Sequence, residues 1–151
     1  MKPEIEKIRQ TIKTLLERLG CPASIDHIEY PDTIYFSIHT KESGLLIGEA
    51  GERLRALNHV IHKMIEHENP DAPKFFVDVN DYQKQKTEEL KDAARLSAQR
   101  VRYFKKEVAM APMSAYERRI VHATLAEYPD IATKSEGEGG ARRVIIRPLS
   151  G

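Results

Sequence analysis

The chain of 151 residues has one cysteine, no tryptophan, and an aromatic content of only 7%. With Cys21 alone, an internal disulfide framework and a zinc site built on several thiolates are both excluded. The longest aliphatic runs, such as residues 45–47, fall far short of the ~20 residues that a membrane-spanning helix needs. The first six residues contain no apolar segment of the secretory type. We therefore expect no membrane insertion and a reducing, cytoplasmic setting.

The chain also lacks a large net charge, because its 24 Lys and Arg side chains are nearly balanced by 23 Asp and Glu side chains. The balance differs between the two parts of the chain. Residues 1–79 carry 10 basic and 13 acidic side chains, whereas residues 80–151 carry 14 and 10. The hydrophobic content of 40% is typical of a folded domain. The basic second part keeps nucleic-acid binding open as a function.

Periodicity in the first part predicts alternating helices and strands. Ile5, Ile8 and Ile12 begin an apolar helical stripe that ends at Gly20. The order that we predict over the first part is helix, strand, strand, helix, glycine turn, helix and strand, with the strands at residues 25–30, 34–38 and 75–79. The two short helices between residues 41 and 68 are separated by the turn.

The second part begins with a long polar helix over residues 82–104. Its core face is predicted to carry Leu90, Ala93, Ala94, Ser97, Val101 and Phe104. A short strand near residues 108–110 and a helix to about residue 127 follow, with Ser114 and Glu117 forming a capping box. Strands are predicted at residues 131–136 and 142–147. The whole indicates an α+β fold of two small domains, residues 1–79 and 80–151.

The glycine turn is a Gly-x-x-Gly segment, Gly48-Glu49-Ala50-Gly51, between two short helices. Glycines let a ligand come close to the backbone, and amides at the start of a helix favour anions. Placed after two strands and before a third, this segment resembles the loop of a type II KH domain, with the order α-β-β-α-α-β over residues 1–79. The resemblance implies that the loop clamps the backbone of single-stranded RNA.

The site that this resemblance implies consists of Gly48, Glu49, Ala50, Gly51 and Arg53. The turn departs from the family pattern, because its two variable positions usually include a basic residue and here hold Glu49 and Ala50. Glu52 adds a further acidic group beside the turn. The alternative is a degenerate KH fold that serves packing or protein contact.

A second candidate site lies on the predicted helix that follows Ser114. Arg118 and His122 are four residues apart, so they share one helical face and can both donate to phosphate oxygens. The segments around them, and Arg142, Arg143 and Arg147 beyond, resemble a small domain named for its Arg-x-x-x-His element (R-3-H), with helices on a three-stranded sheet. Such domains bind single-stranded nucleic acid. The alternative is an ordinary exposed pair on a helix.

A KH domain followed by an Arg-x-x-x-His domain is similar to the bacterial Jag family of SpoIIIJ-associated RNA-binding proteins. The resemblance implies a role in RNA regulation linked to envelope growth or division, and a partnership with a small stand-alone KH protein. We predict a non-catalytic protein that binds single-stranded RNA or DNA, with no cofactor and no metal site. The rival hypotheses are a protein-interaction adaptor and a nuclease. His59, His62 and His67 are expected to be solvated side chains.

Overall fold

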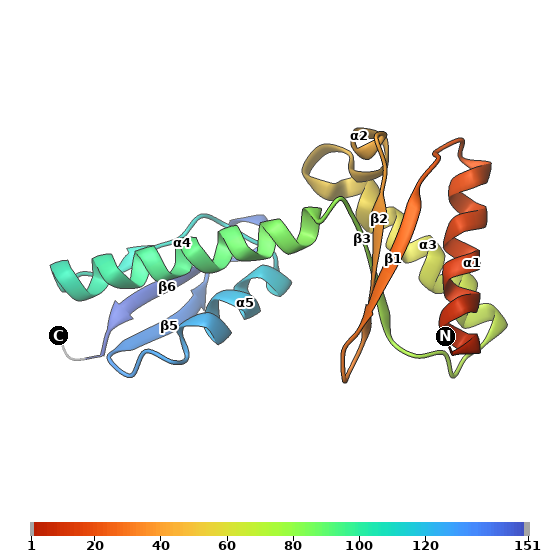
Figure 1. Cartoon of the computed structure of the whole chain (residues 1–151). Coiled ribbons are helices and arrows are strands. Elements are labelled where there is room, and N and C mark those ends of the chain that lie inside the picture. Colours follow the sequence, from red (N-terminus) through yellow and green to blue (C-terminus); the bar gives the residue numbers. More distant parts are fainter. Residues whose placement is uncertain (1, 150–151) are drawn as a thin grey trace. The chain divides into compact units, whose positions relative to one another are not determined.

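The computed structural model describes residues 2–149 and divides the chain into two compact units, Met1–Lys84 and Gln85–Gly151. Each unit combines helices with its own three-stranded sheet (Figure 1). The fold is therefore α+β, as predicted. Within residues 2–149, no helix combines the length and the apolar character needed to cross a membrane.

The first unit follows the predicted order of elements. It comprises α1 (Pro3–Arg18), β1 (Ser24–Glu29), β2 (Ile34–His39), α2 (Ser43–Ile47), a 3₁₀ turn η1 (Glu49–Gly51), α3 (Glu52–Glu68) and β3 (Phe75–Val79). Strand β1 is antiparallel to β2, and β3 is parallel to β2. The parallel pairing is accommodated because α2 and α3 form the crossover between the two strands.

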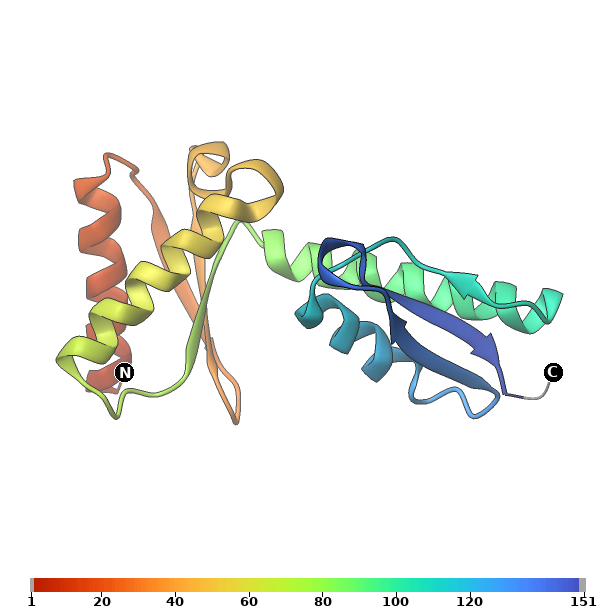
Figure 2. The same ribbon diagram turned by 180° about the vertical axis from the view of Figure 1, so that it is seen from behind.

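Helices α1 and α3 cover one face of this sheet (Figure 2). The apolar stripe that begins at Ile5 is buried there together with Phe36 and Leu54, each at most 2% exposed. Burial of an aliphatic or aromatic side chain contributes about 1.5–3 kcal/mol. The alternating pattern of β2 and β3 thus places one side of each strand in the core.

The carboxylate of Asp78 lies on the opposite face of the first sheet and is fully buried. Its oxygens accept hydrogen bonds from the hydroxyl of Tyr35 at 2.6 Å and from the backbone amides of Gln83 and Lys84. These amides belong to the first turn of α4 (Tyr82–Phe104), where helical amides have no partner within the helix. Asp78 therefore connects β3 to the start of the long helix.

The second unit contains most of α4 and five further elements. They are β4 (Val108–Ala109), α5 (Ala115–Leu125), β5 (Ile131–Glu136), a 3₁₀ turn η2 (Gly139–Ala141) and β6 (Arg143–Pro148). The sheet order is β4-β6-β5, with antiparallel pairing throughout. Its core contains Val101, Val121, Leu125, Val144 and Ile146.

The core face of α4 differs in part from the predicted one. Ala94 and Val101 are buried as predicted, but the third buried position is Ala98, which continues the spacing of four and three residues. The predictions for Ala93 and Phe104 were wrong, since both are exposed and Phe104 retains 63% of its accessible surface. Phe104 is the last residue of α4, and Lys105 turns away with a φ of 57°.

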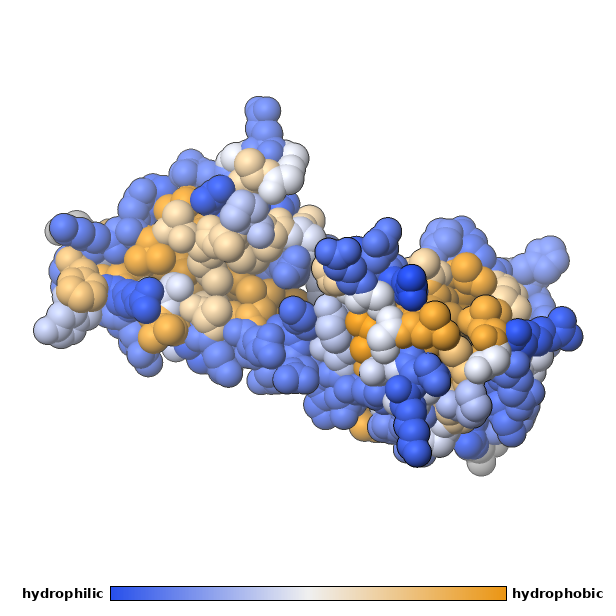
Figure 3. Space-filling model, turned by 90° about the horizontal axis from the view of Figure 1, so that it is seen from above, coloured by the Kyte–Doolittle hydropathy of each residue, from blue (hydrophilic) through white to orange (hydrophobic). Residues whose placement is uncertain are grey.

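The outer surface of each unit mixes polar and apolar areas. Figure 3 shows apolar atoms on the visible face of both units, bordered by hydrophilic side chains. Several large apolar side chains are about half exposed, among them Leu45, Leu96 and Tyr116. The buried clusters are nevertheless separate, one in each unit.

Candidate nucleic-acid interface

The glycine turn has a backbone conformation that few residue types adopt. Gly48 has a φ of 70° and Gly51 a φ of 77°, both in the region that favours glycine. Ala50 between them also has a positive φ, 53°. The amide of Gly51 donates to the carbonyl of Gly48 at 3.4 Å, which closes the turn. The predicted interruption between two helices is therefore present.

Basic side chains from α3 fold back onto this turn. Arg53 packs so closely over Gly48 that a Cβ at that glycine would lie 2.6 Å from the arginine Cγ. Its guanidinium donates to the carbonyl of Leu45 at 3.4 Å, and that of Arg55 donates to the carbonyl of Ala50 at 3.0 Å. The carboxylates of Glu49 and Glu52 are exposed beside them.

The second glycine of the turn is held against α4. A Cβ at Gly51 would lie 2.9 Å from Cε1 of Tyr82, closer than real Cβ contacts come. Gly51 is buried, and Tyr82 packs against the core of the first unit. The absence of a side chain at Gly51 thus serves packing between the turn and the start of α4.

Helix α5 starts with the predicted capping box. The amide of Glu117 donates to the Ser114 hydroxyl at 3.2 Å, and the amide of Ser114 donates to the Glu117 carboxylate at 3.1 Å. One turn further on, Arg118 is partly buried and donates from Nη1 to the carbonyl of Met113 at 2.7 Å. A guanidinium has five N–H donors, so this bond leaves donors for a ligand.

His122 joins α5 to β5. Its Nδ1 lies 2.7 Å from the Thr133 hydroxyl and its Nε2 lies 2.9 Å from the Ser135 hydroxyl. Both ring nitrogens therefore have partners inside the unit, whereas the sequence predicted a donor directed at phosphate. Partial burial, and then the nearby charge of Arg118, lower the pKa of His122. The neutral imidazole pairs well with two hydroxyls, because each hydroxyl can donate or accept.

Arg142 lies close to Arg118 across the segment that precedes α5. The amide of Met113 donates to the carbonyl of Arg142 at 3.1 Å, while the carbonyl of Met113 accepts from Arg118. The guanidinium of Arg142 donates to the carbonyl of Gly137 at 2.7 Å, in the hairpin between β5 and β6. We call Arg118 and Arg142 the arginine pair.

The other two predicted arginines belong to a different face of the sheet. Val144 and Ile146 are buried against the helices, and successive strand residues point to opposite faces, so Arg143 and Arg147 lie on the face away from His122. Arg147 donates to the carboxylate of Glu136 at 3.2 Å and lies 3.9 Å from that of Glu107. Its charge is thus compensated by two carboxylates.

Helix α4 carries a basic row, Lys91, Arg95 and Arg102, whose members all lie close to carboxylates. Lys91 lies 3.5 Å from Glu88, and Arg95 lies 3.3 Å from Asp92, both one helical turn away. Arg102 makes two hydrogen bonds to Asp130, of 2.8 and 2.7 Å. The row therefore stabilises the helix and its packing within the second unit.

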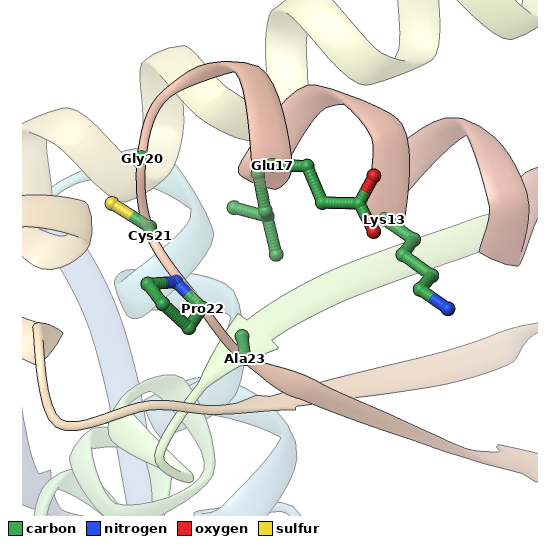
Figure 4. Close-up of a pocket in the computed structure, with 7 residues that line it drawn as sticks. Lys13, Glu17, Gly20, Cys21, Pro22 and Ala23 are labelled. Atoms are coloured by element: carbon green, nitrogen blue, oxygen red, sulfur yellow. The ribbon is translucent and has the colours of Figure 1, made fainter.

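Two side chains of the first unit, those of His62 and Cys21, are at least partly buried. The prediction of a solvated side chain is wrong for His62, which is half-buried. Its ring nitrogens lie 2.6 Å from the carbonyl of Asn58 and 2.8 Å from that of Phe75. Cys21 is buried as an apolar side chain and lines a hollow of about 370 Å³ beside the end of α1 (Figure 4). Lys13 and Glu17 at its rim offer no arrangement of nucleophile and base.

The second unit is a small α+β domain in which Arg118 and Arg142 both contact the backbone of Met113. Residues 88–148 match the R-3-H domain family. The match confirms the predicted Arg-x-x-x-His domain and covers α5, the hairpin and most of α4.

Bacterial relatives named RNA-binding protein KhpB align with both units. The protein of Clostridium symbiosum is 30% identical over 142 residues, which cover 94% of this chain and 63% of that protein. That of Bacillus subtilis is 28% identical over 144 residues, covering 94% and 69%, and that of Lactiplantibacillus plantarum is 30% identical over 135 residues, covering 87% and 41%. The chain thus spans only part of each relative's length.

Proposed function

We propose that this protein binds single-stranded RNA without catalysis and that the R-3-H domain supplies most of the affinity. The observation that carries the proposal is the arginine pair: Arg118 and Arg142 are both partly exposed, and both residues contact the backbone of Met113. Arginine is suited to phosphate because its planar fork makes bidentate contacts. The names of the relatives, which call them RNA-binding proteins, agree with this function.

In this proposal His122 positions the site and does not bind phosphate. Its two hydroxyl partners fix the distance between α5 and β5, and through them the place of Arg118 relative to the hairpin. Arg143 and Arg147 contribute to the field of the domain from the other face. Glu136 and Glu107 reduce the contribution of Arg147.

For the first unit we propose a KH domain whose Gly48–Gly51 turn holds a neighbouring stretch of RNA backbone. The order of elements and the positive φ angles at both glycines support this assignment. The exposed carboxylates of Glu49 and Glu52 oppose phosphate, so we expect the turn to add less affinity than the arginine pair. A stand-alone KH partner, a cytoplasmic location and a link to envelope growth stay predictions of the resemblance.

The proposal is tested by fluorescence anisotropy with a labelled oligouridylate at low ionic strength. The double variant Arg118→Gln/Arg142→Gln is expected to bind at least about tenfold more weakly, because charge-assisted contacts are the strong ones. A matched variant, Lys13→Ala/Arg18→Ala, removes two exposed charges from α1 and is expected to change affinity less than about twofold.

Two results would contradict the proposal. One is the absence of binding by the unmodified chain, and the other is an equal loss in both double variants. Absence of binding combined with a dimeric mass in light scattering would favour the adaptor function. The same titration with oligodeoxyuridylate shows whether the site prefers RNA.

A further inference from the structure

Two adjacent aromatic side chains at the end of α4 face solvent. Tyr103 is 81% exposed and Phe104 is 63% exposed. Their ring centroids lie 4.9 Å apart, with the ring planes at 80°. Single exposed apolar side chains are ordinary on a protein surface, whereas grouped ones mark contact sites. We call Tyr103 and Phe104 the aromatic pair.

The helix that carries the aromatic pair is firmly held up to its last turn. Val101 is fully buried in the core of the second unit. Arg102 makes its two hydrogen bonds to Asp130, and its guanidinium carbon lies 4.6 Å from the ring centroid of Tyr128. The exposure of the aromatic pair is therefore a property of the folded helix and not of a frayed end.

Basic side chains flank the aromatic pair on both sides in the sequence. Arg100, Lys105 and Lys106 are all exposed. Within residues 2–149, neither Arg100 nor Lys106 lies at salt-bridge distance from a carboxylate, and the nearby Glu107 lies 3.9 Å from Arg147. Aromatic rings that accept bases, bordered by cations that neutralise phosphates, are the usual elements of a site for unpaired nucleic acid.

The C-terminal end of α4, which carries the aromatic pair, lies at the opposite end of the second unit from the loop between β5 and β6 (Figures 1 and 2). Arg102 contacts Asp130, which precedes β5, while Ser135 near the other end of β5 contacts His122. At about 3.3 Å per strand residue, these two points are roughly 16 Å apart. A strand of stacked nucleotides, at about 3.4 Å each, needs about five nucleotides to cover that distance.

We propose that the aromatic pair is a second contact for the same single-stranded RNA. Unpaired bases stack on Tyr103 and Phe104, and the neighbouring cations bind the adjoining phosphates. This inference rests on the proposed function, since it extends the path of an RNA already held by the arginine pair. It predicts that oligomers long enough to reach both points gain affinity from the aromatic pair, whereas short ones do not.

An anionic membrane is a less suitable ligand for the same side chains. A helix that lies in a membrane interface presents an apolar face along its length. The apolar face of α4, which includes Ala94, Ala98 and Val101, is instead buried in the core of the unit. On α4 the exposed large apolar side chains are the aromatic pair and the half-exposed Leu96, and only the pair offers rings for stacking with individual bases.

The test measures the affinity of the full chain for oligouridylates of about four, eight and twelve nucleotides, the range of site sizes for such proteins. For the longest oligomer, Tyr103→Ala/Phe104→Ala is expected to lower affinity by about tenfold, the effect of losing base stacking. For the shortest, the expected change is less than about twofold. Tyr30→Ala, which removes an aromatic side chain that is 50% exposed in the first unit, is the matched control.

The conservative variant Tyr103→Phe/Phe104→Tyr is expected to retain the affinity for long oligomers, because it preserves both rings. A 2-aminopurine placed along the longest oligomer reports stacking through fluorescence quenching, and that quenching is expected to disappear in the alanine variant.

Equal affinities of the alanine variant and the unmodified chain for every length would overturn the second contact and leave the proposed function intact. Failure of all lengths to bind the unmodified chain would overturn both. The alanine variant could instead lose binding to anionic phospholipid vesicles and keep its RNA affinity. That result would overturn the RNA contact and assign the aromatic pair to a membrane.

Discussion

The ring of His122 lies with its Nδ1 2.7 Å from the hydroxyl of Thr133, which is 11 residues further along the chain. With the bond from Nε2 to Ser135, this contact makes the histidine a bridge between α5 and β5. The Arg-x-x-x-His element thus combines two different roles. Arg118 offers charge at the surface, and His122 keeps the helix that carries it in place.

Removal of the hydroxyls that hold His122 is expected to destabilise the second unit. Thr133→Val should lower the free energy of unfolding by about 0.5–1.5 kcal/mol, the net value of one hydrogen bond. Urea denaturation followed by circular dichroism measures the change. Thr124→Val is the comparison, since the Thr124 hydroxyl bonds to the carbonyl of Ile120 in its own helix. An equal effect of the two variants would contradict the bridging role of Thr133.

The lowered pKa of His122 predicts a dependence of stability on pH. Burial and Arg118 disfavour the protonated ring in the folded chain, so the unfolded chain binds the proton more tightly. The contribution of His122 is full above its ordinary pKa of 6.5 and is lost as the pH falls below that value. The free energy of unfolding should therefore drop further toward pH 5 in the unmodified chain than in His122→Gln. Parallel pH profiles of the two proteins would argue against this assignment.

The buried carboxylate of Asp78 is expected to be essential for the start of α4. Asp78→Ala leaves the amides of Gln83 and Lys84 without their carboxylate acceptor. The Tyr35 hydroxyl loses its 2.6 Å bond to Asp78 and keeps the 3.2 Å bond to Asp81. The expected loss is about 1–3 kcal/mol per unsatisfied buried group. Tyr35→Phe removes only one of these partners and should cost less. Hydrogen exchange of the first amides of α4 should accelerate in Asp78→Ala, and protection equal to that of the unmodified chain would refute the role.

Glycines at the turn should respond differently from a glycine inside a helix. Gly51→Ala places a Cβ 2.9 Å from Tyr82 at a φ of 77°, so we expect a loss of at least about 1 kcal/mol in stability. Gly44 lies in α2 with nothing within 4 Å of an added Cβ, and Gly44→Ala is expected to stabilise by about 0.5–1 kcal/mol. Thermal unfolding of both variants checks the prediction, and a stable Gly51→Ala would show that α4 can shift away from the turn.

Local signals were sufficient to predict most of the fold. Gly20 and Pro22 end the first helix, strict alternation marks β2, and the capping box of Ser114 and Glu117 fixes the start of α5. Each of these features depends on residues close together in the sequence. The bounds of α4 were predicted for the same reason.

The surroundings of the candidate site residues were predicted less completely, because they depend on register between distant strands. The partners of His122 lie 11 and 13 residues away, and no spacing rule connects them. The placement of Arg143 and Arg147 away from His122 could have been predicted from the sequence, since both alternate with the apolar Val144 and Ile146. The exposure of Phe104 could not have been predicted, because helical periodicity does not reveal where the packed core ends.

The salt dependence of RNA binding tests the central claim most directly, which is that the arginine pair neutralises phosphates. For single strands, the slope of log K against log salt concentration is about −0.7 for each neutralised phosphate. Removing both charges in Arg118→Gln/Arg142→Gln should therefore make the slope less negative by about 1.4. The charge-matched variant in α1, Lys13→Ala/Arg18→Ala, should keep the original slope. An unchanged slope in Arg118→Gln/Arg142→Gln would contradict the account.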